Sequence, residues 1–344
     1  MSTWQEIKDN TRLKNIYDDR IEIIKLIRQY FWSQNFVETD TPVAVRYPGQ
    51  EPYLNPVPVN IHDPDGKEEK FYLHTSPEFA MKKLLAAGYG KIFQITKCFR
   101  DYEEFGGLHN TEFTMIEWYR SPGNFMEIMD DTEQLFKFVA EKFSTDSVEY
   151  KGNKISINRF WHKMTMKEVW KNFLNVELDD YLEIGSLKKL VIEHGYQADD
   201  NDAYEDLFYK IFLNKIEPFL GLESPVFIYN YPACMASLSR LCEGDSRYAE
   251  RFELYAGGLE LANAFGELTD AEEQKIRLEE DREHRKQLGK EVFPVDSSFI
   301  DALKSGISEA GGIALGVDRM VLLFTGAKDI NEVIFQSIND QITE

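Results

Sequence analysis

The stretch KIFQITKCFRDYEEFGGLHNTEFTMIEWY, residues 91–119, decides the fold because it predicts two strands joined by a charged loop. Alternation along the second strand places one set of side chains on a single face: Phe113, Met115, Glu117 and Tyr119. Arg100 ends the first strand, where the loop begins. An arginine suits phosphate or carboxylate groups, an aromatic ring can stack on a base, and a carboxylate can hold a cation. We interpret the hairpin as a binding surface for an amino acid beside a nucleotide; the alternative is an ordinary amphipathic hairpin with a polar loop.

Composition and charge limit the class of protein. The chain has 344 residues, of which 43% are hydrophobic and 13% aromatic, enough for a sizeable core in one large domain or two modest ones. No apolar run approaches the roughly 20 residues that cross a bilayer, and the first residues lack a secretory signal, so we expect a cytoplasmic protein. Three cysteines without CxxC spacing argue against a disulfide framework or a zinc site. The net charge of −21 has the wrong sign for a large nucleic-acid interface.

The order of Phe-Arg, a short acidic loop, HNTEFT and MIEWY resembles motif 2 of class II aminoacyl-tRNA synthetases, in the lysine branch. The resemblance implies an α+β fold, an antiparallel sheet flanked by helices, in one catalytic domain over residues 1–344. It also implies ATP as a substrate, Mg²⁺ as a cofactor and an aminoacyl adenylate as the first product. Helical patterns predict an insertion at about residues 124–220, between motifs 2 and 3.

The N-terminal segment predicts a long helix followed by a strand. Residues 17–35 place Ile21, Ile24, Ile27 and Phe31 at helical spacing, and FVETDTP follows them. A plain amphipathic helix on the core is one explanation. The segment also resembles class II motif 1, which forms the dimer interface in that family, so we expect a homodimer.

Residues 43–70 predict a loop with a hairpin, and TSPEFAMKKLLAAGYG predicts a helix. A capping box between Thr75 and Glu78 would begin this helix, and Gly88 or Gly90 would end it. Capping alone explains Glu78. The family resemblance instead places Glu78 against the amino group of the substrate.

The sequence RFELYAGGLELANAFGEL predicts a hairpin with a two-residue turn at Gly257 and Gly258. Pairing of Tyr255 with Glu260 puts Glu253 and Glu260 on one face. Two carboxylates there can be a solvated face, or they can hold Mg²⁺ together with phosphate oxygens and waters. The resemblance favours the second, since both positions match the metal-binding glutamates of the family.

The strand after this turn needs an irregularity. Asn263, Phe265 and Glu267 share one parity and Glu260 has the other, so a regular strand would point them to opposite faces. A bulge near Leu261, or at the residue after it, would let all four face one pocket.

Near the C-terminus, GISEAGGIALGVDRMVLLFTG resembles motif 3. Its glycines allow close approach to a nucleotide, and Arg319 matches the family's arginine at the terminal phosphate end of ATP. A glycine-rich strand before a buried helix explains the glycines but not the arginine. Ala314 stands where protein ligases of this family have alanine and lysyl-tRNA synthetases have glycine.

The resemblance assigns roles to these residues. Arg100 and Arg319 are the expected catalytic residues, on the α-phosphate and the leaving group. Glu117 and Glu267 repel each other unless a cation lies between them, so they predict an ammonium-bearing substrate. The expected ATP contacts are Arg100, Glu103, His109, Phe113, Glu253, Glu260 and Arg319, with Glu253 and Glu260 as metal ligands; the expected substrate contacts are Glu78, Glu117, Tyr119, Asn263, Phe265, Glu267 and Ala314.

The loop after Arg100 departs from the family pattern. Tyr102 stands where a glutamate is usual, Glu103 follows it, and the loop is one residue longer. This departure affects the expected adenine and phosphate contacts of the loop.

The segment that resembles motif 1 begins almost at the N-terminus, so we expect no anticodon-binding domain before it. In this the chain resembles the elongation factor P lysine ligases. The expected reaction is activation of lysine or β-lysine and its transfer to a lysine side chain of elongation factor P, with tRNA not expected as a partner. Two alternatives stay open: a truncated lysyl-tRNA synthetase-like enzyme that charges tRNA, and a regulatory paralogue that binds lysine.

Overall fold

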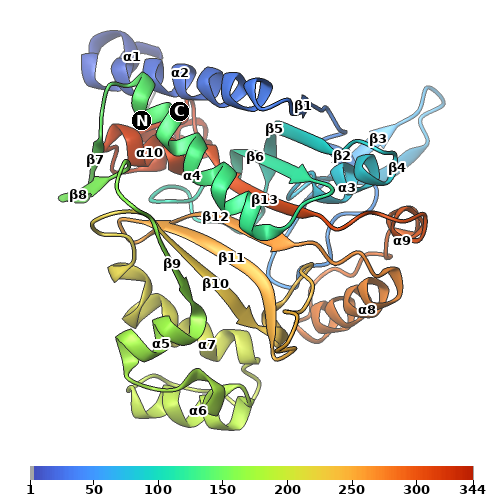
Figure 1. Cartoon of the computed structure of the whole chain (residues 1–344). Helices are drawn as coiled ribbons and strands as arrows, with labels where there is room; N and C mark the ends of the chain where they lie inside the picture. Colours follow the sequence, from blue (N-terminus) through green and yellow to red (C-terminus); the bar gives the residue numbers. More distant parts are fainter. Residues whose placement is uncertain (1–3, 344) are drawn as a thin grey trace.

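The computed structural model describes residues 4–343 and is built around one eight-stranded sheet (Figure 1). In spatial order its strands are β1 (Val37–Glu38), β5 (Lys91–Phe99), β6 (Glu112–Arg120), β13 (Gly311–Gly316), β12 (Leu259–Gly266), β11 (Tyr248–Ala256), β10 (Val226–Pro232) and β9 (His162–Thr165). Neighbours are antiparallel except at the two edges, where β1–β5 and β9–β10 are parallel. The expected α+β fold is confirmed; residues 1–3 and 344 of the expected single domain lie outside the described residues.

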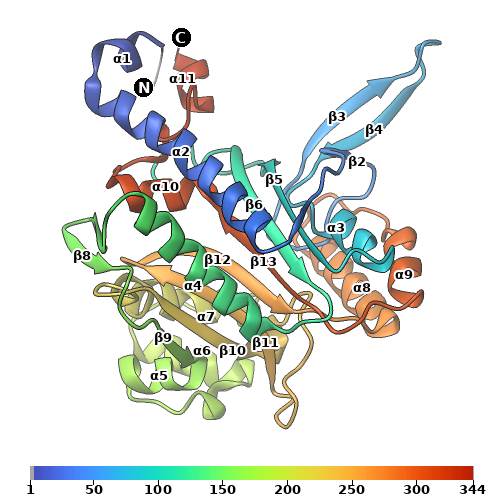
Figure 2. The same ribbon diagram turned by 45° about the horizontal axis from the view of Figure 1, so that its top comes forward.

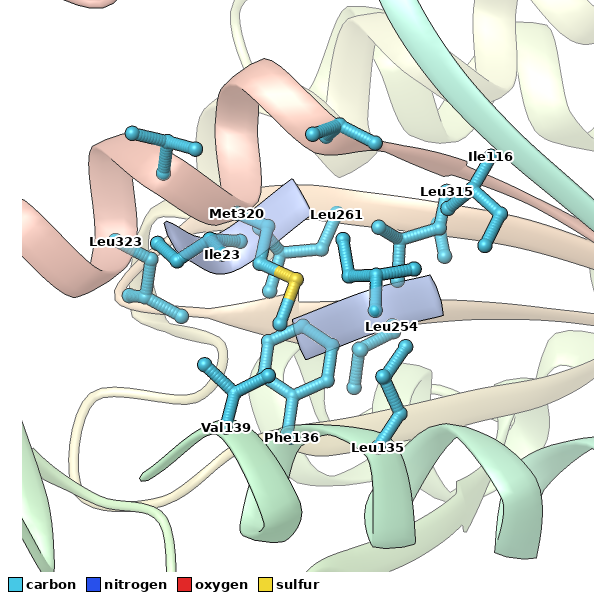
Figure 3. Packing of buried hydrophobic residues seen from close by; sticks show 14 of the residues in the cluster. Ile23, Ile116, Leu135, Phe136, Val139, Leu254, Leu261, Leu315, Met320 and Leu323 are labelled. Carbon is cyan, nitrogen blue, oxygen red and sulfur yellow. The ribbon is translucent and has the colours of Figure 1, made fainter. Parts of the chain in front are cut away.

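One face of the sheet is the main hydrophobic core. Because side chains alternate, Ile116, Leu254 and Leu315 point into this core, and their sequence neighbours point away from it. The helices α2 (Thr11–Ser33), α4 (Phe125–Lys142) and α10 (Val317–Thr325) cover this face. Figure 3 shows side chains from helices and strands interdigitating in this layer. The opposite face is therefore left for polar groups.

The predicted long N-terminal helix is present as α2, and its buried side chains include Ile23 and Ile27. The helix begins after Asn10, whose side chain accepts hydrogen bonds from the backbone N–H groups of Arg12 and Leu13. Ile23 and Ile27 are buried, whereas Ile21 is 54% exposed, so Ile21 does not face the core of this chain. Two residues correspond to a turn of about 200° on a helix, so Ile21 and Ile23 face opposite sides.

The helical region expected over residues 124–220 also contains strands. It holds α4, the hairpin β7 (Ser147–Tyr150) and β8 (Asn153–Ser156), strand β9, and the helices α5 (Met166–Leu174), α6 (Ile184–Glu193) and α7 (Tyr204–Lys215). Helix α4 packs in the main core, and β9 extends the main sheet. Lys151 and Gly152 have positive φ and make the tight turn between β7 and β8. This hairpin was not predicted, because its sequence signal is short and lies between segments with helical periodicity. Helices α5 to α7 form a second hydrophobic cluster with β10 and β11.

A third group of elements lies at the β5 end of the sheet. The helices are α3 (Glu78–Ala86), α8 (Ala271–Gln287) and α9 (Ser297–Lys304), and a small sheet has the order β2 (Ala44–Val45), β4 (Glu68–Leu73), β3 (Val57–His62). The β3–β4 hairpin expected between residues 43 and 70 is present and projects from the body (Figure 2). The remaining elements are α1 (Trp4–Asp9), α11 (Ile338–Thr343) and short 3₁₀ helices at Leu178–Tyr181, Glu217–Phe219, Ala233–Met235 and Ile330–Glu332. Within residues 4–343, no helix has the length and apolar character to cross a membrane.

A buried ion pair ties α2 to the first turn of α10, directly after β13. Arg20 pairs with Asp318, and its Nη2 donates a hydrogen bond of 2.9 Å to the hydroxyl of Thr114 on β6. The second carboxylate oxygen of Asp318 accepts from the backbone N–H of Thr114 at 2.7 Å. Segments that are far apart in the sequence, resembling motifs 1, 2 and 3, are thus joined by one network.

We predict that Arg20→Met lowers the apparent free energy of unfolding in urea by about 3–5 kcal/mol, because it leaves Asp318 buried without its cation. The matched control is Arg12→Met, which removes a pair of 2.6 Å with Glu332 in which the arginine side chain is 50% exposed. This control should cost about 0–1 kcal/mol. Equal effects of the two substitutions would contradict a stabilising role for the buried network.

Candidate functional site

A cavity of about 410 Å³ opens on the face of the sheet opposite the main core. Strands β6, β11, β12 and β13 supply its floor, and α3, α7 and the loops after β2 and β5 supply its walls. Every residue expected to contact ATP, metal or substrate lines this one cavity: Glu78, Arg100, Glu103, His109, Phe113, Glu117, Tyr119, Glu253, Glu260, Asn263, Phe265, Glu267, Ala314 and Arg319. Residues far apart in the chain are therefore gathered around a space large enough for a ligand.

The β11–β12 hairpin has the irregularity that parity requires. Gly257 and Gly258 have φ of 63° and 68° and form the two-residue turn, and Tyr255 pairs with Glu260. The next register pair joins Leu254 to Ala262, so Leu261 is the extra residue. The predicted bulge is confirmed. Both residues after Glu260 enter the main core, and Glu260 can then share the cavity with the odd-numbered residues of β12.

Glu117 is held at the floor of the cavity by two hydroxyl groups. Ser76 Oγ donates to one carboxylate oxygen, and Tyr119 Oη donates to the other at 2.8 Å. Burial, followed by the charge of Glu78, raises the pKa of Glu117 to about 8. The expected capping box of Thr75 is wrong: Thr75 is buried, and Ser76 Oγ accepts from the backbone N–H of Glu78 at 3.0 Å instead. Gly88, with φ of 97°, follows the end of α3 as expected.

Lys82 is a buried cation that the sequence analysis missed. Its Nζ lies 2.5 Å from Glu78 Oε1 and 2.5 Å from Glu267 Oε2. Burial lowers the pKa of Lys82, but the charges of Glu267 and Glu78 outweigh it and raise the pKa above its ordinary value, so the ammonium stays charged. Its spacing of four residues from Glu78 on one helix was the available signal; the partner from β12 was not visible in the sequence.

Glu267 retains capacity for a ligand despite this ion pair. Burial raises its pKa to about 7, and Lys82 opposes the shift. Neither carboxylate oxygen accepts a well-aligned hydrogen bond within residues 4–343. Gly312 on β13 gives it room, since a Cβ there would lie 2.3 Å from Glu267 Oε1 and 2.3 Å from Tyr119 Cε1.

Glu253 is surrounded by internal donors. Arg251 Nη2 donates to its Oε1 at 2.6 Å, and the hydroxyl groups of Tyr231 (2.6 Å) and Tyr255 donate to its Oε2. Arg251 also contacts Tyr209 of α7 at 3.3 Å, so the helical region reaches the cavity. Arg251 was not predicted, because an arginine two residues before Glu253 on a strand cannot be told from a surface residue by sequence alone.

The carboxylate of Glu260 has fewer internal hydrogen-bond donors than that of Glu253. Arg319 Nη1 donates to the backbone oxygen of Glu260 at 2.8 Å and lies 3.5 Å from its carboxylate. Burial, followed by the charge of Glu253, raises the pKa of Glu260 above its ordinary value, and Arg319 opposes this shift. No group of three or more possible metal ligands gathers within residues 4–343. The two glutamates could therefore supply only part of the oxygen shell of Mg²⁺, with phosphate oxygens and waters supplying the rest.

Arg100 stands out among the cations of the cavity because it has no ion pair within the described part of the chain, and its Nε is buried without a hydrogen-bond partner. Its guanidinium carbon lies 5.0 Å from the centre of the Phe113 ring. An arginine in this state is ready to receive an anion.

The longer loop after Arg100 still delivers Glu103 to the cavity. Tyr102 takes φ of 61° and is 88% exposed, so the extra residue is directed into solvent. Glu103 Oε2 lies 2.9 Å from His109 Nδ1, and this hydrogen bond lowers the pKa of Glu103. Gly107 fixes the loop by donating its N–H to Asp329 at 2.8 Å.

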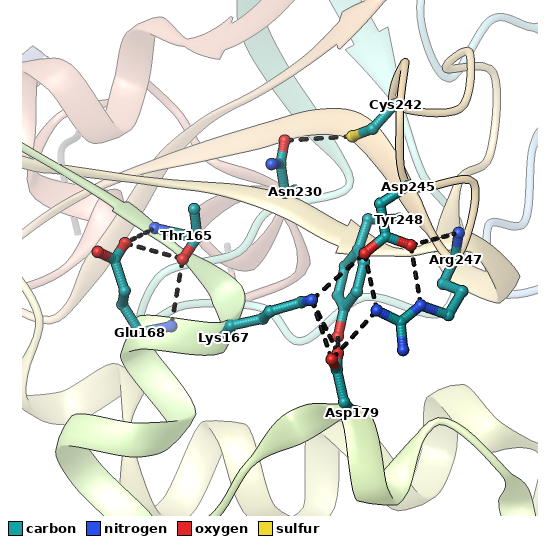
Figure 4. Close-up of polar contacts among 9 residues, drawn as sticks. All are labelled: Thr165, Lys167, Glu168, Asp179, Asn230, Cys242, Asp245, Arg247 and Tyr248. Carbon is teal, nitrogen blue, oxygen red and sulfur yellow. Dashed lines mark hydrogen bonds and ion pairs between the residues drawn. The ribbon is translucent and has the colours of Figure 1, made fainter.

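A polar cluster anchors the helical region beside the cavity (Figure 4). Asp179 accepts from Tyr248 Oη at 2.7 Å and pairs with Lys167 at 2.9 Å and Arg247 at 3.1 Å. Asp245 pairs with the same two cations. The cluster joins α5 to the start of β11, the strand that carries Arg251 and Glu253, and so helps to fix their position.

The chain belongs to the family of class II tRNA synthetases (D, K and N), whose model matches residues 3–339. It is 36% identical to the elongation factor P–(R)-β-lysine ligase of Proteus mirabilis over 92% of each chain, and 34% identical to that of Haemophilus influenzae PittGG over 99% of each chain. It is 38% identical to that of Pseudoalteromonas translucida over 92% of this chain and 93% of the relative. The protein is thus a ligase of this family, which uses ATP to form an aminoacyl adenylate.

We predict that affinity for lysine or β-lysine rises as the pH increases from about 6 to about 9. The raised pKa values of Glu267, about 7, and Glu117, about 8, leave both groups partly protonated at neutral pH, and a substrate ammonium binds the ionised forms. Binding should therefore release protons, which calorimetry in buffers of different ionisation enthalpy measures.

Glu117→Gln and Glu267→Gln should each reduce proton release and weaken lysine binding while leaving ATP binding unchanged. Glu104→Gln, on the exposed part of the motif 2 loop, is the control. Binding without proton release, or unchanged lysine affinity in both pocket variants, would contradict the assignment of these carboxylates.

Proposed function

We propose that the protein activates lysine or β-lysine with ATP and transfers the activated acyl group to a lysine side chain of elongation factor P. The single observation that carries the chemistry is the unpaired, partly enclosed Arg100 beside an aromatic ring and facing a group of carboxylates in one cavity. The names of the relatives, elongation factor P–(R)-β-lysine ligases, support β-lysine and this acceptor.

Charge complementarity supports a substrate with two amino groups. Glu78, Glu117 and Glu267 line the amino-acid end of the cavity, and Lys82 is the internal cation that contacts two of them. With a neutral side chain, the only cation near these three buried carboxylates would be Lys82, and the uncompensated negative charge would cost several kcal/mol. An ammonium group near Glu117, Tyr119 and Glu267 would satisfy them. Phe265, Asn263 and Ala314 complete the walls of this end.

The chain's own residues can bring the two reacting groups together. Arg100 would bind the substrate carboxylate and the α-phosphate, which places the carboxylate oxygen for in-line attack as pyrophosphate leaves. Phe113 would stack on adenine with the ring face that Arg100 leaves free. Arg319 would exchange its contact with Glu260 for the leaving phosphates, and His109 would steady the phosphate chain with Glu103 behind it.

The residues present fit Mg²⁺ as a cofactor of this reaction. Glu260 would be the principal ligand, since its carboxylate has only a long contact of 3.5 Å with Arg319, whereas Glu253 accepts three hydrogen bonds. Glu253 would contribute Oε1, which has one internal donor. When bound, the ion would neutralise charge on the phosphates. The tyrosine and arginine contacts of Glu253 would keep that carboxylate oriented.

A protein acceptor suits the surface of this chain. The net charge of −21 opposes a large phosphate footprint, whereas a basic loop that carries a target lysine would be attracted. The deprotonated amine of that lysine attacks the acyl carbonyl, an amide bond forms, and AMP leaves. Charging of tRNA is disfavoured by the same charge. A purely regulatory, lysine-binding role does not explain the presence of Arg100, Arg319, Glu253 and Glu260 together.

A homodimer is also part of the proposal. Ile21 (54%), Trp32 (53%) and Val37 (49%) are exposed on α2 and β1, and the spacing of Ile21 and Trp32 places them on one side of the helix. Such a stripe is the kind of surface that a second copy would cover.

We predict pyrophosphate exchange into ATP that depends on lysine or β-lysine, and an approximately 100-fold to 1,000-fold lower rate in Arg100→Ala, because this variant loses the cation on the developing charge. Arg159→Ala, at an exposed arginine, is the control and should retain full exchange. Undiminished exchange in Arg100→Ala would remove this residue from the mechanism.

We predict a dimer mass by light scattering at micromolar concentration for the wild-type protein, and a monomer mass for Ile21→Glu combined with Trp32→Glu, since charges at a covered apolar stripe oppose association. Ile61→Glu, on the projecting β3–β4 hairpin, is the control. A monomeric wild-type protein would refute the dimer.

A further inference from the structure

The segment that carries Glu51 is held firmly beside the cavity. Arg285 of α8 is buried, and its Nη1 donates to the backbone oxygens of Glu51 and Leu54, each at 2.7 Å. Gln50 is also buried, and its amide donates to the backbone oxygen of Pro294 at 3.2 Å. The backbone of this loop is therefore fixed before any ligand arrives, which reduces the entropy that binding would cost.

The side chain of Glu51 lines the cavity next to Ser76 and Glu78. Its Oε2 is enclosed and has no hydrogen-bond partner within residues 4–343. The carboxylate lies over Gly49, where a Cβ would come within 2.1 Å of Oε2, so only glycine leaves it this position. Burial and then the charge of Glu78 raise the pKa of Glu51, while its own backbone N–H, Arg100 and Arg285 oppose the shift.

The other carboxylates at this end of the cavity have internal partners. Glu117 accepts from Ser76 and Tyr119, and Glu78 and Glu267 share Lys82. An enclosed carboxylate oxygen without a partner is costly unless a ligand supplies one. Glu51 lines the same cavity as Glu78 and Arg100, and Arg100 is the residue that would bind the reacting carboxyl group of the substrate.

We propose that Glu51 binds the amino group adjacent to the reacting carboxyl group of the substrate and thereby makes the enzyme selective for diamino acids. This role rests on the proposed function. Glu51 would be a specificity-determining residue: its carboxylate and that of Glu78 would flank the α- or β-ammonium, while Glu117 and Glu267 receive the terminal one. The backbone clamp by Arg285 would hold Glu51 ready for this contact.

The test compares β-lysine and lysine with 6-aminohexanoate, which keeps the terminal ammonium and the carboxylate but lacks the second amino group. Glu51→Gln should raise the KM for β-lysine in pyrophosphate exchange by about 10-fold to 100-fold, because one charge-assisted contact with the substrate is lost. Its KM for ATP, and the inhibition constant of 6-aminohexanoate against β-lysine, should stay at wild-type values. Gly49→Ala, which keeps the charge but displaces it, should show the same selective loss, and Glu68→Gln on the exposed hairpin should show none.

If Glu51 had only a structural role, Glu51→Gln would weaken the binding of 6-aminohexanoate and of β-lysine equally. That result would overturn the inference. Unchanged KM for β-lysine in Glu51→Gln, or a wild-type enzyme that binds 6-aminohexanoate as tightly as β-lysine, would overturn it as well. A wild-type protein without exchange for either lysine would instead refute the proposed function, and this inference with it.

Discussion

Carboxylates removed from water need cationic or hydroxyl partners, and this constraint orders the whole cavity. Lys82 forms ion pairs with Glu78 and Glu267. The hydroxyl groups of Ser76 and Tyr119 donate hydrogen bonds to Glu117. Arg251 and two tyrosines donate hydrogen bonds to Glu253. Once these internal pairs are accounted for, the groups left without partners mark where a ligand belongs. Within residues 4–343 these are Arg100 and Glu51, while Glu267, although paired with Lys82, also lacks a well-aligned hydrogen bond.

The geometry that gathers these charges depends on a single extra residue in a strand. Without the bulge at Leu261, Glu260 would point into the main core whenever Asn263 and Glu267 faced the cavity. The bulge lets one face of the sheet remain apolar under α2, α4 and α10 while the other collects polar groups. The sheet is thus both the scaffold of the core and the floor of the site.

Local pattern was enough to predict the two hairpins, the glycine turn and the bulge, because strand parity is a short-range property. The residues around the cavity came from the resemblance to a family, and their places in the structure agree with a common site. Internal partners were not predictable: Arg20 and Asp318, or Lys82 and Glu267, meet only after the chain has folded. The capping role of Thr75 was misjudged for a related reason, since Thr75 is buried in the fold and the hydroxyl group of Ser76 accepts the hydrogen bond instead.

In the proposed function, this cavity activates a diamino acid for a protein acceptor. Mass spectrometry of intact elongation factor P tests it most directly, after incubation with the enzyme, ATP, Mg²⁺ and β-lysine, with tRNA present in the same reaction. We expect a mass increase of one lysyl group on a single lysine of elongation factor P, absent without ATP, while tRNA stays unmodified. Aminoacylated tRNA together with unmodified elongation factor P would contradict it.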